Sequence, residues 1–176
     1  MICLGLDVST RIVGYSLLNE EQVLIRAGFI DLSKIEDLSD KATYLKDKLL
    51  EIKEEYNIDN IGIEDCLTKF AGGRSSIKTI GKLIAFNYLT RYICYTVFDI
   101  KPVVLNVIRA RTLADCKVPR GENSKEYIVS RVMKLYEDID WPRMKKDKTR
   151  FSKECEDIAD SVVISRALIE ESKSNG

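Results

Sequence analysis

Four carboxylic acids stand at places in the sequence where folding would bring them together. Asp7 ends one apolar strand and Glu64 ends another, and both Asp157 and Asp160 lie on one face of a helical pattern near the C-terminus. Carboxylates gathered at one point repel each other and need cations. Their oxygens favour Mg²⁺ or Mn²⁺ over zinc, and a pair of such ions assists hydrolysis of a phosphodiester. We therefore expect Asp7, Glu64, Asp157 and Asp160 to be catalytic and to bind two ions, with Asp7 as the bridging ligand. The neighbouring acids Asp65, Glu154 and Glu156 leave the exact ligand assignment open.

The elements that must position these acids follow from apolar periodicity and turn residues. Short polar connections join the first three strands, which predicts an antiparallel meander. Helices separate the later strands, so the α/β class with a mixed five-stranded sheet flanked by helices is expected for a single domain over 1–176. Ser39 or Asp40 is predicted to cap the first helix, and Ser124 a later one. The predicted strands are 2–7, 15–18, 22–32, 58–65 and 101–105. The first predicted helix extends from its cap at Ser39 or Asp40 to residue 57, and the later helices are predicted over 75–98, 107–116, 124–136 and 153–172.

Composition excludes several kinds of chemistry. Among the 176 residues there is no histidine, which removes Ser-His and Cys-His nucleophile pairs and the usual zinc sites. The five cysteines form no CxxC pair, so neither a zinc site nor a disulfide framework is indicated. No apolar run approaches the roughly 20 residues of a membrane span. The chain opens directly on a strand, which predicts an intracellular protein.

Charge is segregated although lysine and arginine balance aspartate and glutamate at 28 each. Residues 31–65 carry eleven acids and five bases, whereas residues 101–150 carry thirteen bases and seven acids. One interpretation is a side that faces a polyanion, and the other is an ordinary solvated surface. The candidate DNA contacts are Arg74, Lys78 and Lys82, which recur every four residues, Arg120, and a basic cluster formed by Arg143, Lys145, Lys146, Lys148 and Arg150.

Three segments together resemble the RuvC family of Holliday junction resolvases: LGLDVSTRIVGYSLL, IGIEDCL and EDIADSVVIS. The resemblance covers residues 1 to about 169. It implies a ribonuclease H-like fold, a homodimer that acts on four-way DNA junctions, and the four acids as the catalytic set. It also implies that Lys125 lies near the scissile phosphate and Phe70 near the junction centre. The small size and divergent loop resemble phage or viral members, which would act in the cytoplasm of a bacterial host.

The resulting hypothesis is a Mg²⁺- or Mn²⁺-dependent endonuclease that resolves branched DNA during recombination, replication or repair. The alternative of a different class is a catalytically silent module that keeps the fold and binds junctions or other DNA. An actin-like ATPase also opens with a strand and an aspartate turn. The sequence speaks against it, because no glycine-rich phosphate loop follows the strand at Ile61 and the chain is short for two lobes.

Overall fold

The structure is a computed structural model that describes residues 1–66, 77–137, 141–143 and 151–174. Its strands form a mixed sheet in the order β3-β2-β1-β4-β5. Neighbours β1, β2 and β3 pair antiparallel, whereas β4 pairs parallel to β1, and β5 parallel to β4. The predicted five-stranded mixed sheet is therefore confirmed. The strand bounds are β1 (Ile2–Val8), β2 (Ile12–Asn19), β3 (Leu24–Asp31), β4 (Asn60–Glu64) and β5 (Val103–Leu105).

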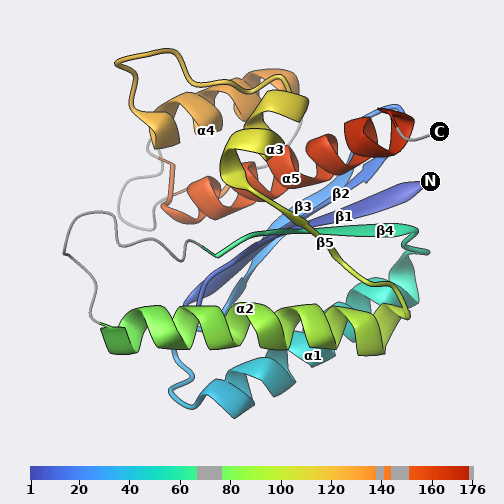
Figure 1. The fold of residues 1–176 in the computed structure, drawn as a ribbon, viewed down its shortest axis with the longest axis vertical. Coiled ribbons are helices and arrows are strands. Elements are labelled where there is room, and N and C mark those ends of the chain that lie inside the picture. Colours follow the sequence, from blue (N-terminus) through green and yellow to red (C-terminus); the bar gives the residue numbers. More distant parts are fainter. Residues whose placement is uncertain (67–76, 138–140, 144–150, 175–176) are drawn as a thin grey trace.

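Helices cover both faces of the sheet (Figure 1). On one face lie α1 (Leu38–Glu55) and α2 (Ile77–Phe98), and on the other lie α3 (Val107–Leu113), α4 (Ser124–Leu135) and α5 (Glu154–Ser174). Each bound differs from its prediction by three residues at most. In the part of the chain that the structure describes, no helix is both long enough and apolar enough to cross a bilayer.

Alternation along β1 divides the core between the two faces. Leu4 and Leu6 are fully buried in the cluster that includes Phe86 of α2, because alternate side chains of a strand point to the same side. Gly5, which lies between them, faces α5. A Cβ atom there would lie 2.3 Å from the carbonyl oxygen of Ser161. Glycine is thus required for the backbone of α5 to rest directly on β1.

Two helix caps differ from the predictions. Helix α1 is capped by Asp37 rather than by Ser39 or Asp40, and helix α4 by Asn123 rather than by Ser124. In both cases the earlier residue is extended and its side chain accepts hydrogen bonds from two backbone N–H groups of the first turn. Sequence alone placed the cap within a cluster of capping residues but not at the right member, because the choice depends on which residue leaves the helical backbone conformation.

We expect Gly5→Ala to destabilise the protein by about 2 kcal/mol or more, because the added methyl group meets backbone atoms that cannot rotate away. Gly81→Ala is the matched control. Gly81 lies in α2 with nothing within 4 Å of a Cβ atom, so alanine there stabilises the helix by about 0.5–1 kcal/mol. Urea unfolding measures both. Equal stability of Gly5→Ala and the wild type would contradict the close contact between α5 and β1.

Candidate active site

Strand pairing brings Asp7 and Glu64 to the same edge of the sheet. Strands β1 and β4 are parallel neighbours whose last pair is Leu6 with Ile63, so each acid directly follows that pair on its strand. The end of β4 is held from the other side by α2, where the buried side chain of Asn87 donates a hydrogen bond of 3.0 Å to the carbonyl oxygen of Glu64. Both strand-end acids are therefore positioned by backbone geometry.

Helix α5 delivers Asp157 and Asp160 to this edge. Gly14 of β2 pairs directly with Asp7, and a Cβ atom on Gly14 would lie 2.1 Å from the carbonyl oxygen of Asp157. The first turns of α5 therefore rest on the sheet beside Asp7. A buried hydrogen bond of 2.7 Å between the hydroxyl groups of Ser16 and Ser165 fixes the helix further along. Figure 1 shows the start of α5 on the same side as the carboxyl ends of β1 and β4.

The other three acids all act on the pKa of Asp7, and Asp160 acts on those of Glu64 and Asp157, so the four acids share one electrostatic environment. Burial raises the pKa of Asp7 well above its usual range, and the charges of Glu64, Asp160 and Asp157 raise it further. Burial and then Asp160 raise the pKa of Glu64 to about 7. Burial, then Glu156 and Asp160, raise the pKa of Asp157 to about 6, and burial raises the pKa of Asp160 as well. Burial is the largest cause in each case, and for Asp7, Glu64 and Asp157 the neighbouring carboxylates add to it.

Two basic side chains offset part of this charge. Arg111 of α3 lies 3.6 Å from Asp160, and it lowers the pKa of both Glu64 and Asp160 against the effect of burial. Its other terminal nitrogen donates a hydrogen bond of 2.6 Å to Ser124. Lys125, in the first turn of α4, is paired with Glu156 at 2.5 Å and lowers the pKa of Asp7 and Asp157. The ion pair of Lys125 with Glu156 thus forms one border of the acid group.

The chemistry of the acid group fits a hard divalent cation, but its geometry is not that of a closed ligand set. All donors are carboxylate oxygens, which suit Mg²⁺ or Mn²⁺. Among the described residues, no three acidic or cysteine side chains are arranged to hold a metal ion. Mutual repulsion keeps uncompensated carboxylates apart. The neighbouring Asp65 is 3.0 Å from Arg91 and Glu156 is paired with Lys125, so both of these extra acids already have cationic partners.

Some of the predicted DNA contacts lie among the described residues and others lie outside them. Lys78 and Lys82 are exposed on the first turns of α2, which begins on the same side as the acids (Figure 1), and Arg120 is exposed between α3 and α4. The guanidinium group of Arg143 stacks on the ring of Phe151 at 3.8 Å. The other predicted contacts, Phe70, Arg74, Lys145, Lys146, Lys148 and Arg150, lie outside the described residues.

Sequence reasoning missed Arg111 and Asn87. Arg111 lies in a short helix with a second arginine two residues earlier, and nothing in that pattern distinguishes the one that reaches the acids. Asn87 carries a signal that was available: it is a polar residue in the middle of a largely apolar helix, and it is buried. A buried amide requires a partner, and this one finds the end of β4.

The mixed sheet in the order β3-β2-β1-β4-β5, with helices on both faces, matches the ribonuclease H-like fold of RuvC. Thermus thermophilus RuvC bound to a Holliday junction substrate has a TM-score of 0.68 at 10% identity, over 99% of this chain and 96% of that one. Fowlpox virus resolvase in complex with Holliday junction DNA has a TM-score of 0.55 at 19% identity, over 97% and 98%. The yeast mitochondrial Holliday junction resolvase has a TM-score of 0.58 at 16% identity, over 96% and 77%. No protein-family model and no curated protein matches the sequence.

We expect the metal-free protein to be less stable at pH 8 than at pH 5. The acids bind protons more tightly in the folded than in the unfolded chain, so the free energy of unfolding falls as the pH rises from their unfolded pKa values to their raised folded pKa values. For Glu64 this range of pH runs from 4.5 to about 7. Asp7→Asn removes one of the repelling charges and is expected to raise the free energy of unfolding at pH 8 by about 1 kcal/mol, with a smaller gain at pH 5.

Urea unfolding in EDTA at the two pH values measures this effect. Asp47→Asn, at an exposed position of α1, is the control and is expected to change little at either pH. A lower stability of Asp7→Asn than of the wild type at pH 8 would show that Asp7 is not repelled by its neighbours.

Proposed function

We propose that this protein is a Mg²⁺- or Mn²⁺-dependent endonuclease that resolves four-way DNA junctions by paired hydrolysis of phosphodiesters. The observation that carries the proposal is the group of four acids, Asp7, Glu64, Asp157 and Asp160, which β1, β4 and α5 bring to one edge of the sheet, where the other three raise the pKa of Asp7. The fold that holds them is shared with a RuvC and with a viral resolvase whose structures contain junction DNA. Phage origin and a cytoplasmic site of action stay predictions.

The side chains of the site have separate tasks in this reaction. The four acids would hold two ions, which supply Lewis acidity for phosphodiester hydrolysis when bound. Arg111 counteracts the burial of Glu64 and Asp160 and so favours their ionised forms, which are the forms that bind cations. Lys125 is largely exposed beside the acids, and its ammonium group can stabilise the charge that develops on the scissile phosphate.

Basic residues on both sides of the acids supply the DNA contacts. Phosphate contacts by lysine and arginine contribute most of the affinity of proteins for DNA. Lys78 and Lys82 are exposed on α2, and Arg120 is exposed on the connection between α3 and α4, so the acids lie between cations from two different layers of the fold. We assign these three residues, together with Phe70 and Arg74, to junction binding.

The exposed face of α2 suits the homodimer that paired cutting requires. Tyr88, Tyr92 and Tyr95 have exposed fractions of 60%, 65% and 51%, and the exposed Ala85 continues the same face toward the start of the helix. A small residue followed by exposed tyrosines allows close helix approach and supplies the aromatic contacts that are enriched at protein interfaces. We propose that two copies associate through this face of α2, which places Lys78 and Lys82 near the dimer axis.

One observation favours the alternative of a catalytically silent junction-binding module. The described acids are not arranged as a closed ligand set, as expected if the protein bound junctions without cutting them. Incubation of the protein with a labelled four-way junction and Mg²⁺ separates the two functions. Symmetrically cut product supports the endonuclease, whereas a bound but intact junction supports the silent module.

We expect Asp7→Asn and Asp160→Asn each to reduce junction cutting in Mg²⁺ below detection, because either change removes a charged ligand from the acid group. Junction affinity in EDTA is expected to remain within about threefold of the wild type or to increase, since less negative charge then faces the phosphates. Asp47→Asn controls for charge and is expected to cut normally. A variant at Asp7 or Asp160 that still cuts at the normal rate would exclude the four-acid site.

We expect Tyr92→Glu to convert the protein from dimer to monomer in sedimentation experiments, because a carboxylate would be buried without a partner at the centre of the α2 face. Tyr44→Glu is the matched control, since Tyr44 is also an exposed tyrosine but lies on α1. The monomer should nick one strand without the paired second cut. A Tyr92→Glu protein that remains dimeric would place the interface elsewhere.

A further inference from the structure

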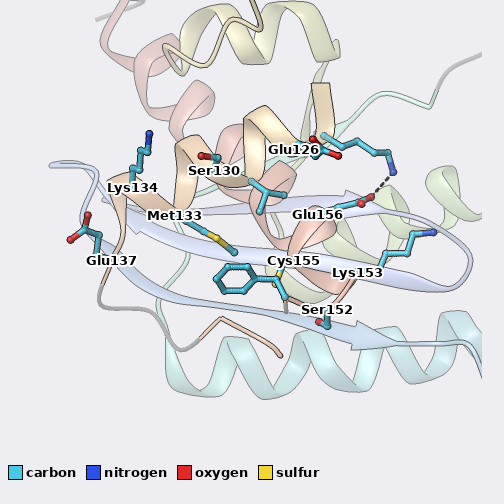
Figure 2. A pocket seen from close by; sticks show the side chains of 12 residues that line it. Glu126, Ser130, Met133, Lys134, Glu137, Ser152, Lys153, Cys155 and Glu156 are labelled. Atoms are coloured by element: carbon cyan, nitrogen blue, oxygen red, sulfur yellow. Dashed lines mark hydrogen bonds and ion pairs between the residues drawn. The ribbon is translucent and has the colours of Figure 1, made fainter. Parts of the chain in front are cut away.

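A groove of about 750 Å³ lies between α4 and residues 151–156. This volume falls in the range of sites for small organic groups. Most of its wall is apolar and comes from Val129, Met133, Phe151 and Cys155. Figure 2 shows Met133 extending from α4 toward Cys155 on the opposite side. The four acids contribute no residue to this groove, so it is separate from the site described above.

The groove and the acid group share a border. Lys125 and Glu156, the ion pair at 2.5 Å, line the groove, and Glu156 is next in sequence to Asp157. Figure 2 shows Glu156 and Lys153 at one end of the groove and Lys134 and Glu137 at the other. A phosphate that contacts Lys125 at the acid edge therefore has a neighbouring nucleotide within reach of the groove.

The lining suits a flat aromatic group with polar edges. Phe151 is 41% exposed, and the guanidinium group of Arg143 stacks on its ring, so an aromatic surface and a delocalised cation lie together beside the groove. Aromatic rings and guanidinium planes are the groups on which proteins stack unpaired bases. The hydroxyl group of Ser152, which also lines the groove, is buried beside the Cys155 thiol.

From these observations we propose that the groove takes one unstacked nucleobase of the DNA strand that is cut, next to the scissile phosphate. The proposal rests on the proposed function and adds to it a subsite that reads the bases flanking the cut. The cleavage preference of the enzyme then depends on how well the base at that position fits between Met133 and Phe151. A protein segment is a less suitable occupant, because the stacked Arg143 and the shared Lys125 both favour a group attached to a phosphate chain.

The experiment combines a filled groove with a missing base. Met133→Trp places a bulky side chain in the groove, and Leu135→Trp adds the same bulk to an exposed position of α4 that does not line it. Junction affinity in EDTA and cutting rate in Mg²⁺ are measured on intact junctions and on junctions with a single abasic nucleotide at each of the two positions on either side of the cut.

The expected result is that one abasic position weakens wild-type binding or cutting about tenfold, as loss of a stacked base does. Met133→Trp should show the same loss on the intact junction and no further loss on the abasic one, while Leu135→Trp behaves as the wild type.

The proposal is overturned if no abasic position matters, or if the losses from Met133→Trp and from the abasic nucleotide multiply. It is also overturned if Met133→Trp lowers the melting temperature of the free protein but leaves junction binding and cutting unchanged, which would mean that the groove takes no base. A wild type that neither binds nor cuts junctions overturns the proposed function as well, whereas normal cutting with unaffected abasic junctions overturns the subsite alone.

Discussion

The backbone contact between α5 and the sheet is the constraint on which the rest of the structure depends. Glycines at positions 5, 14 and 62 of three adjacent strands lie under the helix, and a Cβ atom at any of them would meet its atoms at 2.3, 2.1 and 2.9 Å. Because the helix rests this close, Asp157 and Asp160 reach the edge where Asp7 and Glu64 end their strands. The same contact concentrates negative charge, and apolar packing of α5 on both sides of the acids holds them together against their repulsion.

That repulsion explains why cations recur around the site. Arg111 of α3 pairs with Asp160 and Lys125 of α4 pairs with Glu156, so ion pairs join both α3 and α4 to α5. The pKa values of the four acids nevertheless remain raised, chiefly by burial and also by neighbouring carboxylates. Bound cations would favour the ionised acids, which is the electrostatic basis for the proposed metal dependence.

The two faces of the sheet divide the work of the proposed reaction. The face with α1 and α2 anchors Glu64 through Asn87 and presents the tyrosines of α2. The face with α3, α4 and α5 carries the remaining acids, Arg111, Lys125 and the groove beside them. The proposed dimer contact and the proposed base-reading subsite could therefore change independently of the four acids, since neither uses their side chains.

The sequence by itself determined the order and type of the elements, because alternation and helical periodicity are local properties of the chain. It also singled out the four acids that the structure brings to one edge of the sheet, since strand ends and the three-residue spacing of Asp157 and Asp160 are visible without a structure. Only the tertiary structure decided that Arg111, rather than a neighbouring base, contacts Asp160 and that Asn87 holds the end of β4. It also decided that Asp37 caps α1, that Asn123 caps α4, and that Glu156 forms an ion pair with Lys125. These contacts join residues through backbone direction and the distance between helix and sheet, and no local pattern encodes either quantity.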